Sequence, residues 1–75
     1  MKNIKVKIDT LKVEMQNRQY SMEFQKIILD AATKFNCSKM VIYSSWNYFL
    51  SNGKSKYKNF NDINKYILTR LNSTL

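Results

Sequence analysis

Residues 39–50 read KMVIYSSWNYFL, and the conformation of this stretch decides the fold. It is rich in β-branched and aromatic side chains, which favour a strand. Asn52-Gly53 follows, and then KSKYKNF, an order typical of a tight hairpin turn between two strands. Apolar side chains also recur here at helical spacing, at Ile42, Trp46, Phe49 and Leu50. Ser38 would cap such a helix and Gly53 would end it, so both interpretations are open.

Residues 3–16, NIKVKIDTLKVEMQ, alternate between apolar and polar side chains. Ile4, Val6 and Ile8 occupy one parity, and after Asp9-Thr10 the apolar residues shift by one position to Leu11, Val13 and Met15. A period of two predicts a strand, and the shift predicts a turn or bulge at Asp9-Thr10. We expect a β-hairpin here, with one long bulged strand as the alternative.

Two other segments have the features of amphipathic helices. Ser21 is a suitable N-cap, and Asn36 can adopt the left-handed conformation that ends a helix, which predicts a helix over residues 22–35. Its apolar stripe consists of Phe24, Ile27, Ile28, Ala31, Ala32 and Phe35. Near the C-terminus, Asn61 as a cap and Asp62 in the first turn predict a second helix. Its stripe consists of Ile63, Tyr66, Ile67 and Leu71.

A weak internal repeat favours the strand interpretation of residues 39–50. Tyr20 precedes Phe24, Ile27 and Ala31 in the first half, and Tyr57 precedes Phe60, Ile63 and Ile67 in the second. Two similar halves predict two ββα units. We therefore expect a single α+β domain over residues 1–75, with the order ββαββα. A four-stranded antiparallel sheet would carry both helices on one face and leave the other open to solvent.

Charge narrows the class of partner. The 75 residues include 13 Lys and Arg against five Asp and Glu, a formal net charge of +8 at pH 7. Such a charge on a small domain produces a positive field that favours anionic partners such as nucleic acid. Only Arg18 and Arg70 are arginine. Because arginine makes the bidentate contacts that read guanine, this balance indicates binding to the phosphate backbone.

The predicted strands would arrange lysines in rows. Lys54, Lys56 and Lys58 alternate, so in a strand they would share a face and follow a phosphate backbone. Lys5 and Lys7 would form a second row. Tyr43 and Phe49, if exposed, would stack on bases, whereas Trp46 and Tyr48 are expected in the core with Ile42 and Leu50. The competing interpretation is that these lysines only prevent strand edges from aggregating.

Residues 31–46, AATKFNCSKMVIYSSW, resemble a helix-turn-helix. Ala32 matches the alanine of the first helix, Asn36 the turn, Cys37 the small apolar position and Ser38 the start of the second helix. Ile42 and Trp46 match its core positions. The resemblance implies that Lys39, Met40, Tyr43, Ser44 and Asn47 face the major groove, with KSKYKNF as a wing. The fold would then be an N-terminal β-hairpin followed by a winged helix-turn-helix. An ordinary αβ connection ending at Asn36 accounts for the same residues.

Catalytic chemistry has little support in the sequence. The chain has no histidine, its five carboxylates are scattered, and its one glycine cannot form a phosphate-binding loop. Cys37, the single cysteine, fits a packing role in a reducing compartment. We expect no enzymatic activity, no cofactor and no metal.

The expected function is nucleic-acid binding through phosphate contacts, to DNA or RNA, as in a small phage or mobile-element regulator. Lys39 and Asn47 would join the lysine rows and Tyr43 at the interface. The alternative is a phage-type protein that binds and inhibits or adapts a host protein, such as a nuclease. An exposed strand edge would also allow homodimers. MKNIKVKIDT has no apolar centre and no segment reaches about 18 apolar residues, so we expect a cytoplasmic protein without membrane spans.

Overall fold

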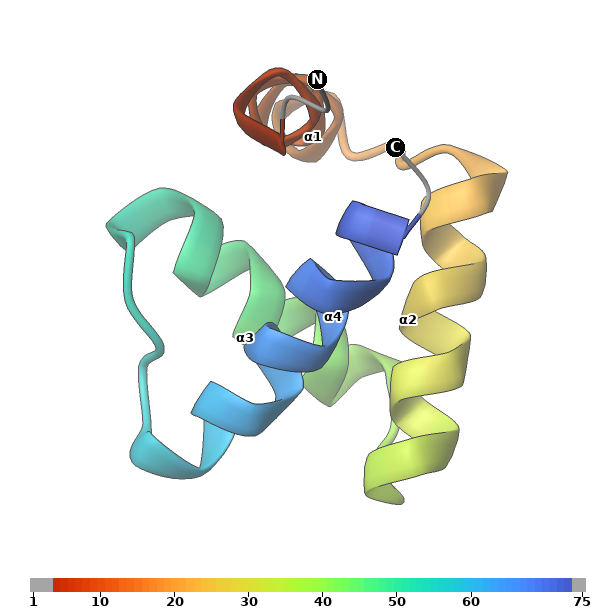
Figure 1. Cartoon of the computed structure of the whole chain (residues 1–75), viewed down its shortest axis with the longest axis vertical. Coiled ribbons are helices and arrows are strands. Elements are labelled where there is room, and N and C mark those ends of the chain that lie inside the picture. The colour runs from red at the N-terminus through yellow and green to blue at the C-terminus, as the bar shows by residue number, and fades with distance from the viewer. Residues whose placement is uncertain (1–3, 74–75) are drawn as a thin grey trace.

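The computed structural model describes residues 4–73, and in this range the chain forms helices and no strand. The helices are α1 (Ile4–Gln16), α2 (Met22–Phe35), α3 (Lys39–Asn52), the short 3₁₀ helix η1 (Lys58–Phe60) and α4 (Asn61–Ser73) (Figure 1). The predicted α+β fold with a four-stranded sheet is therefore wrong. The N-terminal hairpin and the β wing of the alternative fold are wrong as well.

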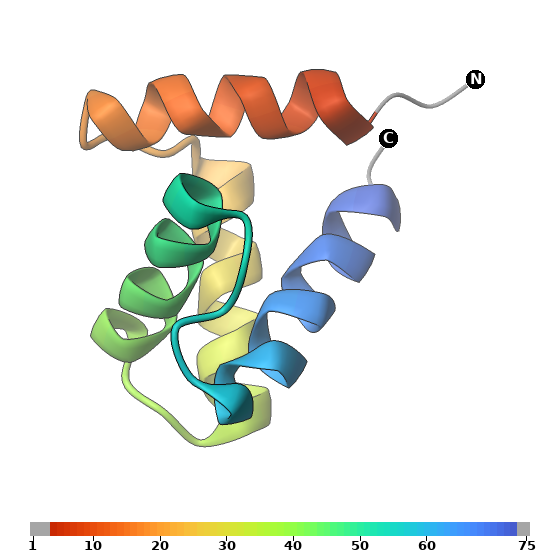
Figure 2. The ribbon, with the colours of Figure 1, turned by 90° about the vertical axis from the view of Figure 1, so that its left-hand side faces the viewer.

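Helices α2, α3 and α4 pack against one another, and α1 lies across one end of this group (Figure 2). That end contains the start of α2 and the last turns of α3 and α4. All four α-helices contribute to one buried apolar cluster, which consists of Leu11, Phe24, Ile27, Ile28, Ala31, Ala32, Ile42, Trp46, Leu50, Ile63, Ile67 and Leu71. No helix among the described residues is long and apolar enough to cross a membrane.

The segment predicted to be a hairpin is helix α1. Its apolar residues fit the helical period of 3.6 as well as the strand period of two. Ile4, Ile8, Leu11 and Met15 recur at the i, i+4, i+7 spacing of one helical face, and they pack against the core. Leu11 is only 3% exposed, whereas Val6 is 58% and Val13 57% exposed on the opposite side. The shift of parity at Asp9-Thr10 is thus the helical period and not a turn.

Helix α2 has the predicted bounds and caps. The Ser21 hydroxyl accepts a hydrogen bond from the backbone N–H of Phe24, and Asn36 adopts a left-handed conformation with φ 54°. The N–H groups of Asn36 and Cys37 then donate to the carbonyls of Thr33 and Ala32. These bonds close the helix in the Schellman pattern, which explains why its end could be predicted from sequence.

Helix α3 shows that residues 39–50 follow the helical interpretation. The Ser38 hydroxyl accepts from the N–H of Val41, and Gly53 ends the helix with φ 73°. Trp46 is fully buried, with ring centroids 5.8 Å from Phe24 and 5.5 Å from Phe49. Burying one complete face against α2 and α4 outweighs the strand preference of these residues, which is worth about 1 kcal/mol per residue at most.

The segment after Gly53 is not a strand, so the predicted repeat is wrong. Residues 54–57 form a loop that leads into η1, and the Asn52-Gly53 pair ends a helix instead of turning a hairpin. Helix α4 then begins at Asn61, which is itself helical with φ −56° and ψ −44°. Trp46 is in the core as predicted, but Tyr48 is partly exposed.

Candidate functional site

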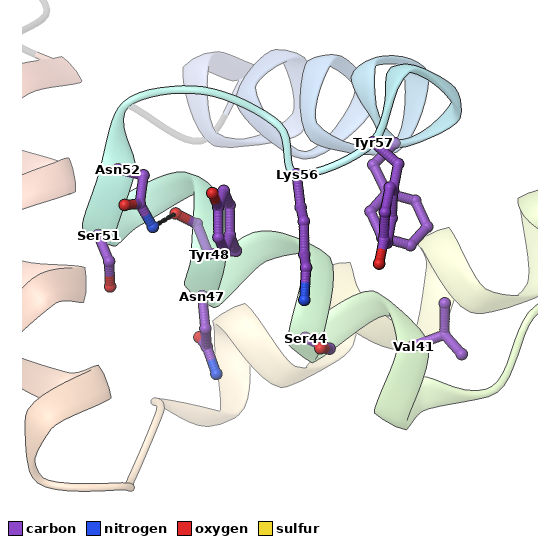
Figure 3. A pocket seen from close by; sticks show the side chains of 9 residues that line it. Val41, Ser44, Asn47, Tyr48, Ser51, Asn52, Lys56 and Tyr57 are labelled. Carbon is purple, nitrogen blue, oxygen red and sulfur yellow. Dashed lines mark hydrogen bonds between the residues drawn. The ribbon is translucent and has the colours of Figure 1, made fainter.

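The outer face of α3 lies between two connecting segments. The loop of residues 53–57 is on one side, and the connection between α1 and α2 is on the other (Figure 3). Beneath the loop is a hollow of about 410 Å³. Its walls are Val41, Ser44, Asn47, Tyr48, Ser51, Asn52, Lys56, Tyr57 and Phe60. Hydroxyl, amide and aromatic groups of α3 thus face a lysine that extends from the loop.

Two further hollows continue this surface along α3. One, of about 520 Å³, lies against the α1–α2 connection and shares Asn47 with the first hollow. The other, of about 550 Å³, lies between α2 and the start of α3, and it contains Lys39 and Tyr43. Tyr43 lines both. We call the outer face defined by Lys39, Tyr43, Ser44, Asn47 and Lys56 the α3 surface.

The α3 surface is mostly positive, and among the described residues Glu23 is the one carboxylate that lines any of its three hollows. Residues 31–61 contain no Asp or Glu, and they contain five lysines, Lys34, Lys39, Lys54, Lys56 and Lys58. The side-chain amines of Lys39, Lys54 and Lys58 are exposed, and none pairs with a carboxylate within residues 4–73. The amine of Lys56 lies 5.8 Å from the Tyr48 ring centroid and 5.5 Å from that of Tyr57. This part of the molecule therefore attracts anions.

A buried polar relay holds the lysine loop in place. The Ser45 hydroxyl donates a 3.2 Å hydrogen bond to Oδ1 of Asn64, and Nδ2 of Asn64 donates a 2.9 Å bond to the Ser55 hydroxyl. Asn64 is only 2% exposed. Because Ser55 lies between Lys54 and Lys56, the relay ties both lysines to the packed helices. The sequence alone did not indicate this relay, since Asn64 follows Ile63 without an obvious polar pattern.

A tyrosine pair adjoins the α3 surface. The Tyr20 ring stacks on that of Tyr43 at a centroid distance of 5.8 Å, and its hydroxyl donates to Oδ1 of Asn47. Burial, and then the nearby Tyr43 and Glu14, raise the pKa of Tyr20 far above its usual 10.0. Burial also raises the pKa of Tyr43. Both tyrosine hydroxyls therefore carry protons at neutral pH. The side chain of Asn47 directs its amide nitrogen away from α3 (Figure 3).

The structure gathers some of the predicted site residues and separates others. Lys39, Tyr43, Asn47 and Lys56 belong to the α3 surface, and Lys54 and Lys58 are exposed beside it. Lys5 and Lys7 lie on α1, and neither lines any of the three hollows of the α3 surface. The expected lysine rows are wrong, because neither segment is a strand. Phe49 is partly buried against Trp46, which removes it as an exposed stacking group.

Two carboxylates have structural roles, and Glu23 lines the hollow that contains Lys39 and Tyr43. Asp30 pairs with Arg70 at 2.8 Å, and Glu14 accepts a 3.1 Å hydrogen bond from the N–H of Ser21. Cys37 is half-buried, and its thiol donates to the carbonyl of Phe35 at 3.3 Å. Within residues 4–73 no three His, Cys, Asp or Glu side chains are grouped to hold a metal ion.

The segment that resembles a helix-turn-helix, residues 31–46, contains the end of α2 and the first part of α3, joined by Asn36, Cys37 and Ser38. Ala32, Ile42 and Trp46 are buried, whereas Met40 and Ser44 are exposed on the outer face of α3. Comparisons with protein-family models, with curated proteins and with solved structures found no match to this chain.

Proposed function

We propose that this chain is a small, non-enzymatic, cytoplasmic protein that binds nucleic acid, with the α3 surface placed against duplex DNA. The observation that carries this proposal is the charge of the surface. The outer face of α3 and the loop that adjoins it are supplied by residues 39–61, which have four lysines and no carboxylate. Lysines of this kind would neutralise backbone phosphates and release their counterions.

The arrangement of α2 and α3 supports a helix-turn-helix mode of docking. In that mode the second helix enters the major groove, and its N-terminal residues reach the base edges. Here the first turns of α3 expose Lys39 and Met40, and Tyr43 beside them is half-buried against Tyr20. Ser44 and Asn47 follow on the same face. These are the positions that the resemblance assigns to the groove.

The helix dipole adds to this support. Helices α2 and α4 each have an acidic residue in the first turn, Glu23 and Asp62, as helix stability prefers. Helix α3 has none, and it begins with Lys39 instead. A cation at the positive end of a helix costs a few tenths of a kcal/mol in stability. The same cation beside free N–H groups favours a bound anion such as a phosphate.

Sequence reading by the α3 surface would be limited. Helix α3 has no arginine, so the bidentate guanine contact is absent from it. Tyr43, Ser44 and Asn47 offer single hydroxyl and amide contacts. We therefore assign most of the binding free energy to phosphate contacts, which predicts a strong dependence on salt.

The test is fluorescence anisotropy with labelled duplex DNA, single-stranded DNA and RNA, at low and near-physiological salt. We expect the tightest binding to duplex DNA. The triple variant K54Q/K56Q/K58Q should bind more weakly, and the slope of log K against log salt should decrease by about 2 to 3, close to one unit per lost phosphate contact.

A matched triple on α1, K5Q/K7Q/K12Q, removes the same charge from another element. We expect it to retain most of the affinity and slope of the unchanged chain. If the α1 triple lost as much as the loop triple, net charge and not the α3 surface would explain binding. Absence of binding to all three ligands at low salt would refute the proposal.

A second candidate function is binding to a host protein, such as inhibition of a nuclease. The hollow between α2 and the start of α3 supports it, because large apolar side chains are exposed in or beside it. Met40 is 79%, Met22 78% and Leu29 51% exposed. A partner that co-purifies after nuclease treatment, and is lost from M22S/M40S, would favour this function over the first.

A further inference from the structure

The hollow beside the α1–α2 connection is a concentration of hydrogen-bond donors. It is lined by Met15, Arg18, Gln19, Tyr20, Gln25, Tyr43 and Asn47. None of these is a carboxylate, and the nearby Glu14 carboxylate, which raises the pKa of Tyr20, accepts a hydrogen bond from the N–H of Ser21. The side chains of Arg18 and Gln19 make no hydrogen bond or ion pair within residues 4–73. Arginine with adjacent amide and hydroxyl donors is the chemistry that binds phosphate oxygens.

The backbone at Arg18 gives no reason for an arginine. Arg18 has φ 56°, in the left-handed region, and its N–H donates to the carbonyl of Met15 while that of Gln19 donates to Glu14. This is the Schellman end of α1, and its left-handed position favours glycine or asparagine. The equivalent position after α2 is Asn36. Arginine is therefore unfavourable for the local backbone, which points to a role for its side chain.

Asn47 is oriented as a donor toward the same hollow. Its Oδ1 accepts the 2.6 Å hydrogen bond from the Tyr20 hydroxyl, so the rest of the amide presents Nδ2. The connection that carries Arg18 is held nearby, because Nε2 of Gln25 donates to the carbonyl of Tyr20 at 2.8 Å. An amide fixed in this way cannot make the paired donor and acceptor contact that reads adenine. It can donate to a phosphate oxygen.

We propose that Arg18 and Asn47, with the hydroxyl of Tyr43, bind one phosphate group of the nucleic acid. This phosphate site rests on the proposed function, and it adds a residue from outside residues 31–61. Arg18 is on the α1–α2 connection, and Lys56 is on the loop at the other side of the outer face of α3 (Figure 3). Helix α3 then has a cation on each side, as needed to meet the two phosphate backbones that border a groove.

The left-handed backbone at Arg18 allows a test that separates binding from folding. Arg18→Gly and Arg18→Asn remove the guanidinium and suit the conformation, so the melting temperature should stay the same or rise. Duplex affinity should nevertheless fall about three- to tenfold at near-physiological salt, and the salt slope should decrease by about 1. Lys12→Gln, an equal charge change at an exposed position of α1, should change both far less.

A second measurement uses inorganic phosphate as the probe and does not depend on DNA. In ¹H–¹⁵N NMR spectra of the unchanged chain, phosphate should shift the Arg18 Nε–H and Asn47 side-chain signals more than other side-chain signals. Arg18→Gly should abolish the Asn47 shift. Normal duplex binding by Arg18→Gly and Arg18→Asn would refute the phosphate site and leave the proposed function intact. The unchanged chain could also fail to bind any nucleic acid. In that case, absence of the phosphate-induced shifts would refute the phosphate site as well, and their presence would show that the site binds another phosphate ligand.

Discussion

The phenolic hydroxyl of Tyr20 donates a 2.6 Å hydrogen bond to Oδ1 of Asn47, a residue 27 positions further along the chain. The bond joins the α1–α2 connection to the outer face of α3. Tyr20 also contacts the rings of Phe24 and Tyr43, at centroid distances of 4.6 and 5.8 Å. One side chain thus joins the core to the surface proposed to bind nucleic acid.

Tyr20→Phe should remove this bond and leave the ring contacts in place. We expect a loss of about 1 kcal/mol in the free energy of unfolding, measured by urea denaturation, because Asn47 is only partly exposed. Duplex affinity should fall modestly, since the Asn47 amide can then rotate away from the phosphate. Tyr57→Phe, at an exposed tyrosine, is the control for stability and should leave the free energy of unfolding unchanged.

Stability should decrease in alkaline solution because of the same residue. The pKa of Tyr20 is raised by folding, so above pH 10 the unfolded chain loses this proton while the folded chain keeps it. The contribution of the Tyr20 hydroxyl to the free energy of unfolding is fully present below about pH 10, and it is lost as the pH rises toward the pKa of Tyr20 in the folded chain. Urea midpoints at about pH 8 and pH 11 should differ less in Tyr20→Phe. A residual decrease would come from Tyr43, whose pKa burial also raises. Equal pH dependence in both chains would contradict the assignment.

Asn64→Ala should be costly because Asn64 is buried and bonded on both sides. The buried Ser45 hydroxyl would lose its acceptor, and Ser55 would lose its tie to α4. We expect a loss of about 2 to 3 kcal/mol in unfolding free energy and faster amide exchange over residues 53–57. Asn72→Ala, on the exposed side of α4, is the matched control. Similar small losses in both variants would show that the relay contributes little.

Gly53→Ala should destabilise the chain through its backbone alone. Nothing lies within 4 Å of an added Cβ, so no clash is involved, but φ is 73°. An alanine held in the left-handed region costs about 1 kcal/mol. Gly53→Asn should cost less, because asparagine tolerates this conformation, as Asn36 does. Thermal unfolding of the two variants measures the difference, and a neutral Gly53→Ala would contradict the observed C-cap.

Leu11→Ala and Val13→Ala distinguish a helix from a strand at the N-terminus. In α1 Leu11 is buried and Val13 is exposed. We therefore expect Leu11→Ala to lower the free energy of unfolding by about 2 to 5 kcal/mol, and Val13→Ala to lower it by less than about 0.5 kcal/mol. In a strand both side chains would share a face and behave alike. Urea denaturation is sufficient, and comparable losses would overturn the helical assignment.

Several features followed from the sequence because independent local signals agreed. For α2, the apolar spacing, the Ser21 cap and the Asn36 end all indicate the same bounds, and the structure has them. The stripe of α4 was equally consistent, and Ile63, Ile67 and Leu71 are buried. The lysines around the α3 surface could also be named, since charge and exposure are properties of the residue type.

The remaining features depended on contacts distant in sequence. The pattern of residues 3–16 fits two periods, and only packing of Leu11 against the core selects the helix. Residues 39–50 prefer a strand locally, and Ile42, Trp46 and Leu50 would share a face in either conformation. Packing of this face, with Ser45, against α2 and α4 selects the helix. Arg18 was not predicted as a site residue, because Asn47, which lines the same hollow, lies far along the chain on α3. The sequence by itself determined the charge, the caps of α2 and two helices, which are local properties. The tertiary structure alone decided α1, α3 and the grouping around Asn47, because the free energy of burial comes from contacts that no local pattern specifies.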